Sequence, residues 1–342
     1  MNEPDNNEKN QTKSKAPKIC MVVLIIVAVM ASIVYGMKVL GRKKLIANAL
    51  APMTDVGDNG QEDEADADLY VDGIGYKYKD NMINILLLGV DTNSNSDNSK
   101  HQADVIMLAA VDDQDKSITL ISIPRDTMTD IDIYDVNGNN VGLKKSQIAL
   151  AYSYGLDEAS SCELTKTSVS RLMYGIPING YFAGYMDAVP IVNDAVGGVS
   201  VTLVQDIKNI GKNGDTVTLY GKTALSYLRY RDKEDAVSAR KRESNQKIYL
   251  ESFISALKEK CRTSPLFIND LLNTINEYSI TDISADSAVY LASQAFANTS
   301  INMITVKGEN NTDNTLTEYY VDDAELQKVI LHLFYNQITK ED

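Results

Sequence analysis

"INILLLGV", residues 83–90, is a short and continuous apolar run, which is the pattern of a buried β-strand. The runs "VIMLAAV" (105–111) and "SITLISIP" (117–124) predict two further strands. The segment between these two runs, "DDQDK" (112–116), has the length of a hairpin turn. We therefore expect the second and third strands to be antiparallel neighbours.

Charged residues stand where these expected strands end. Asp91 follows the first strand, Asp104 precedes the second and Arg125 follows the third. If the second strand runs down beside the first, and the hairpin brings the third strand back up, the three residues meet at one edge of a sheet. This edge is the first candidate for a functional site.

The remainder of the chain alternates between helical and strand patterns, which indicates an α/β or α+β sandwich. Helical periodicity and glycine stops predict helices at 144–155, 163–175, 244–260 and 322–337, and a short helix, a Gly-Gly turn and a strand within 187–203. Further strands are expected within 177–186 and 301–308, and a strand, a short helix and an arginine-bearing segment within 217–231.

The N-terminal segment "ICMVVLIIVAVMASIVYGM" (19–37) is uncharged and long enough to cross a bilayer core of about 30 Å. A cleaved signal peptide would have a shorter apolar core, and Cys20 opens the segment rather than closing it as a lipoprotein anchor would. Lysines flank both ends, but the short tail favours a cytoplasmic N-terminus. We expect a cytoplasmic tail at 1–18, a transmembrane helix at 19–40, an acidic extracellular stalk at 41–80 and an extracellular domain at 81–337.

The composition argues against several classes of function. A net charge of −14 over 342 residues does not suit a nucleic-acid partner. The two histidines, His101 and His332, are too few for a histidine-rich zinc site, and neither is well suited to activate Ser153 as a nucleophile. Cys162 and Cys261 lie in the expected extracellular part, and the sequence leaves open whether they form a disulfide.

The stretch "ALSYLRYR" (224–231) places Arg229 and Arg231 two residues apart, and so on one side if the segment is a strand. Two adjacent guanidinium groups repel each other unless an anion lies between them. That anion is either a carboxylate in a surface salt-bridge network or a ligand phosphate, which arginine binds in a bidentate fork. Asp91 and Asp104 are the kind of carboxylate pair that Mg²⁺ accepts beside phosphate oxygens. The pattern favours a site for Mg²⁺ and a pyrophosphate.

Seven segments together resemble the LytR–CpsA–Psr family of cell-wall enzymes. The resemblance is distinct over residues 82 to 260 and continues more weakly to about residue 337. Together the seven segments indicate this family specifically, although no single segment would be enough. They are "NILLLGVD" (84–91), "ADVIMLAAV" (103–111), "LISIPRDT" (120–127), "LAYSYG" (150–155), "DAVGGVSV" (194–201), "ALSYLRYR" (224–231) and "RESNQKIYL" (242–250).

The resemblance implies a single-span membrane protein with an external α/β/α sandwich, in which a central mixed sheet flanked by helices encloses an apolar tunnel for a polyprenyl chain. Members of the family move glycopolymers from a polyprenyl-pyrophosphate carrier onto peptidoglycan, with Mg²⁺ assisting. By resemblance, Asp91 and Asp104 hold the metal, and Asp104 and Arg125 act in catalysis. The residues expected to bind the phosphates are Arg125, Arg229, Arg231, Arg242 and Gln246.

The chain departs from the family pattern at four positions near this site. Asn93 and Asn245 stand where the family usually has arginine, and Gln102 replaces the arginine of an Arg-Ser-Asp sequence. Ala239 stands where an aspartate is expected. At least two cations near the phosphate are therefore missing. Their loss weakens the case for full activity but does not affect the predicted fold.

We expect a membrane-anchored phosphotransferase of this family. In the expected reaction a peptidoglycan sugar hydroxyl attacks the polymer-linked phosphate and releases polyprenyl phosphate. Two alternatives remain open, namely a non-catalytic protein that binds polyprenyl-linked lipid or wall polymer, and a structural wall-anchoring domain with a salt-bridged edge. The replaced arginines favour the alternatives, whereas the retained aspartates and the three arginines Arg125, Arg229 and Arg231 favour the enzyme.

The expected topology can be tested on intact cells. Proteolytic shaving should remove the domain at 81–337 and leave the tail at 1–18 protected, because the two would lie on opposite sides of the membrane. Immunoblots against both parts, before and after lysis, give the measurement. A domain that becomes cleavable only after lysis would contradict the predicted orientation.

Overall fold

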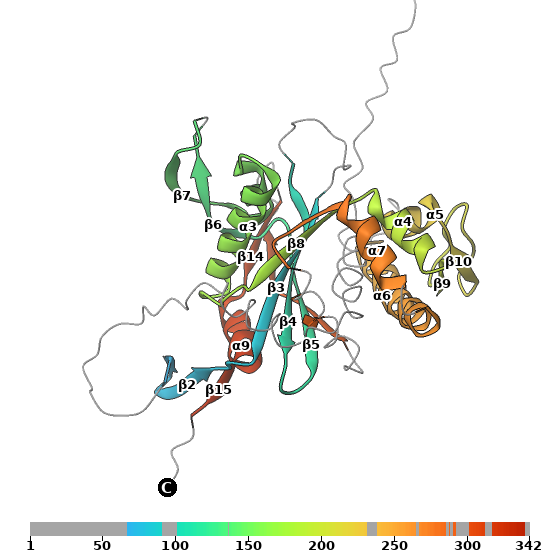
Figure 1. Ribbon diagram of the computed structural model, residues 1–342. Helices are drawn as coiled ribbons and strands as arrows, with labels where there is room; N and C mark the ends of the chain where they lie inside the picture. Colours follow the sequence, from blue (N-terminus) through green and yellow to red (C-terminus); the bar gives the residue numbers. More distant parts are fainter. Residues whose placement is uncertain are drawn as a thin grey trace, which may run out of the picture.

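The computed structural model describes a central sheet with helices on both of its sides (Figure 1). The predicted tail at 1–18 and the predicted span at 19–40 lie outside the described residues, and so do Asp91 and Arg231. Within the described part of the chain, no helix is long and apolar enough to cross a membrane. The described residues are 67–90, 101–135, 137–230, 238–264, 267–284, 287, 290–291, 301–311 and 317–338.

Six strands form the central sheet, in the order β11-β8-β3-β4-β5-β12. The pairs β3–β4, β4–β5 and β8–β11 are antiparallel, whereas β3–β8 and β5–β12 are parallel, so the sheet is mixed. The three strands expected from the apolar runs are indeed neighbours, which confirms their predicted pairing. The strands are β3 (Met82–Val90), β4 (Ala103–Asp112), β5 (Ser117–Ile123), β8 (Gly180–Tyr185), β11 (Ser279–Thr281) and β12 (Ile301–Thr305).

The two middle strands form the core of the sheet, because every residue of β3 and β4 is buried. Asn84 is a polar residue inside β3, and its amide nitrogen donates to the carbonyl oxygen of Pro177 at 2.8 Å and to the hydroxyl of Tyr78 at 3.0 Å. The backbone N–H of Asn84 donates to Oδ1 of Asn179, and the backbone N–H of Asn179 donates back to the carbonyl of Asn84, both at 2.7 Å. These bonds align the segment before β8 with β3.

Helices cover the sheet on both sides, as the sequence predicted. Figure 1 shows α3 and the β6–β7 hairpin on one side, and α4 to α7 with the β9–β10 pair on the other. The 3-10 helix η1 contacts α3 and β6 and so belongs to the first side. The first group comprises β6 (Met128–Tyr134), β7 (Asn140–Gln147), η1 (Ile148–Tyr154) and α3 (Glu158–Leu172). The second comprises α4 (Ala188–Ala195), β9 (Val199–Thr202), β10 (Thr216–Leu219), α5 (Lys222–Arg229), α6 (Ser238–Thr263) and α7 (Phe267–Asn276).

A small three-stranded sheet lies at the start of the described chain. It has the order β1-β2-β15 and joins residues from the two ends of the domain. Its first two strands fall within the range 41–80 that the sequence predicted as stalk, so the folded part begins before residue 81. The strands are β1 (Leu69–Val71), β2 (Ile74–Tyr78) and β15 (Tyr335–Gln337), and α9 (Asp323–Phe334) leads directly into β15. A separate pair is formed by β13 (Gly308–Asn311) and β14 (Glu318–Val321).

Two predicted helices are partly wrong. The range 144–155 contains the end of β7 and the 3-10 helix η1, because β7 pairs along its length with β6. The range 322–337 is helical only to Phe334, because the last residues pair with β2, with Tyr335 opposite Tyr78. In both cases pairing with another strand overrides the local helical pattern, in the first with the preceding strand β6 and in the second with β2 from the other end of the domain.

The stretch "ALSYLRYR" is also not a strand. Helix α5 runs through it to Arg229, because Ala224, Tyr227 and Leu228 stand at helical spacing and are buried. The helix ends at Tyr230, whose backbone is extended. The short helix expected within 217–231 is therefore confirmed, and the condition under which Arg229 and Arg231 would share one side of a strand is not met at Arg229.

Two buried tyrosines join α5 to α6. The ring centroids of Tyr227 and Tyr249 are 6.3 Å apart, and Tyr249 stacks on Phe253. The hydroxyl of Tyr249 donates to Oδ1 of Asn193 in α4 at 2.7 Å, whereas among the described residues the hydroxyl of Tyr227 has no hydrogen-bond partner. Burial also raises the pKa of the Tyr227 hydroxyl well above its ordinary value, so it stays protonated.

The difference between the bonded Tyr249 hydroxyl and the Tyr227 hydroxyl can be tested with a matched pair of variants. Tyr249→Phe should lower the free energy of unfolding by about 1–3 kcal/mol, because it leaves the buried acceptor of Asn193 without its donor. Tyr227→Phe should be neutral or stabilising, because it removes a buried hydroxyl that has no partner among the described residues. Urea unfolding followed by circular dichroism measures both effects, and equal losses in the two variants would show that the described bonding is wrong.

Candidate functional site

The candidate site begins with an ion pair between Asp104 and Arg125. Asp104 lies at the start of β4 and Arg125 just beyond the end of β5, and Nη1 of Arg125 contacts Oδ1 of Asp104. The antiparallel register, with Ile106 opposite Ile123, brings the two to the same edge of the sheet. Their side chains are 8% and 19% exposed, so the pair is largely shielded from water.

Arg125 is held by more than one acceptor. Its Nη2 donates to Oε1 of Gln102 at 2.6 Å, and its Nε lies 3.5 Å from Oδ1 of Asp126. A guanidinium carries five N–H donors in a planar fork. One donor on each of its three nitrogens faces these protein acceptors, which leaves about two donors of the terminal nitrogens for a ligand.

The main chain of the segment after β5 is fixed by two other elements. The carbonyl of Arg125 accepts from the backbone N–H of Ala149 in η1 at 3.1 Å, and the carbonyl of Asp126 accepts from the N–H of Tyr319 in β14 at 2.8 Å. The amide nitrogen of Gln147 donates to Oδ1 of Asp126 at 3.1 Å and to the carbonyl of Thr317 at 2.7 Å. Arg125 therefore projects from a backbone with little freedom to move.

Ser153 has a structural contact in this region. Its hydroxyl donates to the carbonyl oxygen of His101 at 2.7 Å and so joins η1 to the segment that enters β4.

A second group of predicted residues lies on α5 and α6. Arg229 is the last residue of α5, and Gln246 in α6 is 2% exposed with its amide nitrogen 3.5 Å from the carbonyl of Leu228. Arg242 also lies in α6, but its side chain is outside the described part of the structure, as is all of Arg231. The described contacts thus form two groups, one at the sheet edge and one between two helices.

Asn245 stands beside Gln246 and is fully buried. Among the described residues neither its amide oxygen nor its amide nitrogen has a hydrogen-bond partner. Leaving such a group without a partner costs about 1–3 kcal/mol, so a buried amide of this kind requires an explanation. The amide oxygen needs a hydrogen-bond donor and the amide nitrogen needs an acceptor. Ligand hydroxyl groups or bound water molecules could provide both.

The predicted metal site is only partly described. Within the described residues no group of three or more acidic, histidine or cysteine side chains could hold a metal ion. Of the two aspartates expected to bind Mg²⁺, Asp104 is described and Asp91 is not. A carboxylate of Asp104 suits Mg²⁺ by its chemistry, and one of its oxygens already contacts Arg125.

Two residues of the site had no role in the sequence analysis. Gln102 was noted only as a replacement for arginine, although a glutamine can accept a hydrogen bond and an arginine cannot, which is the signal that could have suggested it. Gln147 was assigned to a helix, and no local signal indicates that it would fix Asp126. Both act on Arg125 or on its neighbour.

Comparisons with known proteins agree with this architecture. The model of the LytR_cpsA_psr family matches residues 49–334. A protein of Oceanobacillus iheyensis named polyisoprenyl-teichoic acid–peptidoglycan teichoic acid transferase TagU is 29% identical over 259 residues, which cover 74% of this chain and 75% of the relative.

Solved structures show the same fold. The crystal structure of Bacillus subtilis TagV has a TM-score of 0.57 at 23% identity and covers 75% of this chain and 96% of TagV. A structure of TagT bound to LI-WTA has a TM-score of 0.55 at 22% identity and covers 74% of this chain and 89% of TagT. The family match spans most of the chain and includes both groups of site residues, and the chain belongs to the LytR–CpsA–Psr family.

Proposed function

We propose that this protein transfers a cell-wall glycopolymer from a polyprenyl-pyrophosphate carrier to peptidoglycan. The observation that carries the proposal is the shielded pair of Asp104 and Arg125, oriented by Gln102, at the sheet edge of a fold shared with this family. The name of the relative from Oceanobacillus iheyensis, a teichoic acid transferase acting on peptidoglycan, supports the choice of donor and acceptor class.

Arg125 would bind the phosphate that is transferred. Its remaining donors can contact phosphate oxygens, and its positive charge would offset the negative charge that develops on them during transfer. Because its guanidinium is already held by Asp104, Gln102 and the neighbouring Asp126, little reorganisation would accompany binding. Arg229, Arg231, Arg242 and Gln246 would contact the remaining phosphate oxygens and their surroundings.

The proposed reaction breaks the phosphoanhydride bond of the pyrophosphate and forms a phosphate ester bond to peptidoglycan. The oxygen of a peptidoglycan sugar hydroxyl forms a bond to the polymer-linked phosphorus, and the bond from that phosphorus to the oxygen of polyprenyl phosphate breaks. The hydroxyl proton passes to a carboxylate or to water. Mg²⁺, when held by Asp91 and Asp104, would neutralise the charge of the departing phosphate.

Membrane anchoring and an apolar tunnel complete the proposal. A polyprenyl chain must be kept from water while its pyrophosphate reacts, which an apolar cavity inside the domain would accomplish. The predicted transmembrane helix at 19–40, which contains the uncharged run 19–37, would hold the domain at the membrane that contains the carrier.

A second candidate function is binding without turnover. Gln102 and Asn245 are neutral at positions where cations were expected, and fewer cations mean weaker stabilisation of the charge that builds up during transfer. In that case the same site would hold a polyprenyl-linked polymer without transferring it. The two functions differ in whether the purified chain forms a polymer–peptidoglycan bond.

The transfer role of Arg125 can be tested with a matched control. Arg125→Lys should lower the rate of polymer transfer by roughly 100-fold or more, because a lysine cannot reproduce the oriented fork. Arg171→Lys is the control, because Arg171 pairs with Asp132 at 3.1 Å and bonds to the carbonyl of Asp130 in the β6–β7 hairpin.

The measurement is the transfer of labelled lipid-linked polymer to peptidoglycan by the purified full chain. Unchanged transfer in Arg125→Lys would sink the proposed role of this residue. Tight binding of the donor without any transfer by the wild-type chain would favour the binding function instead.

The proposed lipid carrier generates a separate expectation. Gentle native mass spectrometry of protein extracted from its own membrane should reveal a co-purifying polyprenyl phosphate, because an apolar tunnel would retain the lipid through purification. Titration of delipidated protein with the same lipid should restore the added mass. A protein that carries no lipid and takes none up would contradict the tunnel.

A further inference from the structure

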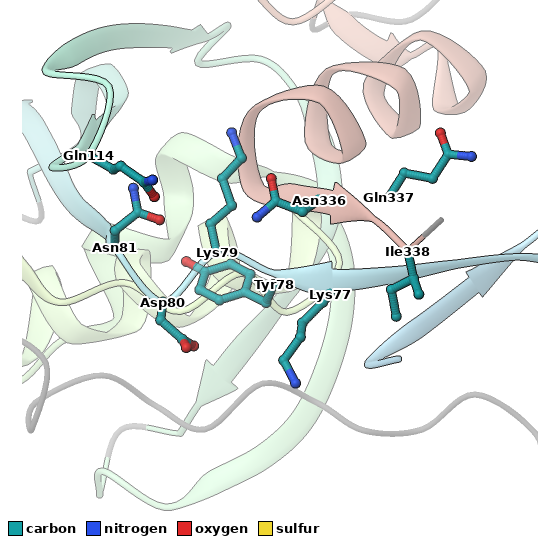
Figure 2. Close-up of a pocket in the computed structure, with 9 residues that line it drawn as sticks. All are labelled: Lys77, Tyr78, Lys79, Asp80, Asn81, Gln114, Asn336, Gln337 and Ile338. Atoms are coloured by element: carbon teal, nitrogen blue, oxygen red, sulfur yellow. The ribbon is translucent and has the colours of Figure 1, made fainter. Parts of the chain in front are cut away.

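A polar pocket lies at the edge of the central sheet opposite to Asp104 and Arg125. It has a volume of about 430 Å³, within the range of roughly 300–1,000 Å³ that is usual for small-ligand sites. Strand β2, the turn before β3, the β4–β5 turn and β15 supply its walls. The residues that line it are Lys77, Tyr78, Lys79, Asp80, Asn81, Gln114, Asn336, Gln337 and Ile338 (Figure 2).

The walls of this pocket are fastened together by Asp112, which is 5% exposed. Its Oδ1 accepts from the side-chain nitrogen of Asn81 and from the backbone N–H groups of Gln114 and Asp115, at 3.0 and 2.9 Å for the two backbone bonds. Its Oδ2 lies 3.6 Å from Nζ of Lys79. One buried carboxylate thus fixes the turn before β3 against the β4–β5 turn.

Backbone bonds fix the remaining wall. The N–H of Lys79 donates to the carbonyl of Phe334 at 2.9 Å, and the N–H of Ile338 donates to the carbonyl of Gly75 at 2.8 Å. The pocket is therefore formed in advance by paired strands and bonded turns, which reduces the entropy that a ligand must lose to bind there.

The charges around the pocket nearly cancel. Lys79 lies beside Asp112, and the remaining lysine of the lining, Lys77, is matched in number by Asp80. Figure 2 shows Lys77 and Asp80 extending to one side of the Tyr78 ring, and Asn81, Gln114, Asn336 and Lys79 gathered on the other. An anionic ligand would find no uncompensated excess of positive charge among the described lining residues.

The uncharged lining residues are mostly carboxamides. An amide side chain both donates and accepts hydrogen bonds, which matches sugar hydroxyl and acetamido groups, since these also do both. Among the described residues no partner bonds to the side-chain amides of Gln114, Asn336 or Gln337, so all three are available to a ligand. Tyr78 and Ile338 add apolar surface of the kind that packs against the carbon face of a sugar ring.

We propose that this pocket binds an uncharged glycan segment, and so forms a second glycan site in addition to the transfer site. The choice of a wall glycan as its source rests on the proposed function. Strand β4 runs from Asp104 at one edge to Asp112 at the other, which at about 3.3 Å per residue separates the two sites by roughly 26 Å. A glycan held here would keep the domain close to the wall polymer, which raises the effective concentration of acceptor at the transfer site.

The probe for this site is N,N′,N″-triacetylchitotriose, an uncharged N-acetylated oligosaccharide. The full chain in detergent should bind it, and the double variant Gln114→Ala/Asn336→Ala should bind about tenfold or more weakly, because two neutral hydrogen-bonding groups are lost. Gln327→Ala is the matched control, because Gln327 is an exposed amide on α9 that does not line the pocket. Isothermal titration calorimetry measures the affinities, and thermal unfolding checks that each variant is folded.

Each outcome decides between alternatives. Equal affinity in the double variant and in Gln327→Ala, or absence of binding by the wild-type chain, would overturn the glycan site. Binding of inorganic pyrophosphate that is lost in Lys77→Ala, without oligosaccharide binding, would make the pocket an anion site and also overturn it. Arg125→Lys should bind the oligosaccharide normally even though transfer is lost, so failure of the transfer role and failure of this pocket give different results.

Discussion

The antiparallel pairing of β3 with β4 and of β4 with β5 is the constraint on which the rest of this structure depends. Every residue of β3 and β4 is buried, and a shift of one residue in their register would exchange the side chains that face the two helical layers. The same pairing decides which loops share an edge. It places Arg125 next to Asp104, and it places the β4–β5 turn next to the segment that enters β3.

This strand pairing could be predicted from the sequence, because the three strands are continuous apolar runs and a short polar turn separates two of them. The β6–β7 hairpin was missed for the opposite reason. Six of the eight residues of β7 are exposed, so no alternation of buried and exposed side chains marked it as a strand. Strands β1, β2 and β15 were missed because each is short, and because β2 and β15 pair only where the two ends of the domain meet.

The part of the site that lies at strand ends could be predicted from the sequence. Asp104 and Arg125 could be placed together from topology alone, whereas Gln102 and Gln147 could not, because their roles depend on which atoms face them across a loop. The neutral residues are the informative ones. Gln102 stands where an arginine was expected, and it accepts a hydrogen bond from Arg125. The cation lost at position 102 is therefore accompanied by an additional acceptor that orients Arg125. Asn245 shows no such compensation among the described residues, since both ends of its amide are buried without a partner.

Strand β4 carries a buried aspartate at each of its ends, and each carboxylate holds groups of a neighbouring segment in place. Counted as whole residues, Asp104 and Asp112 are 6% and 5% exposed, and each would be costly to bury without partners. Asp104 obtains its partner from the side chain of Arg125, so the stabilised group is a cation that can still contact a ligand. Asp112 obtains its partners from two backbone N–H groups, Asn81 and Lys79, so the stabilised structure is the wall of a pocket. One end of the strand therefore orients a charge for anionic chemistry, and the other shapes a cavity in which charge is already balanced.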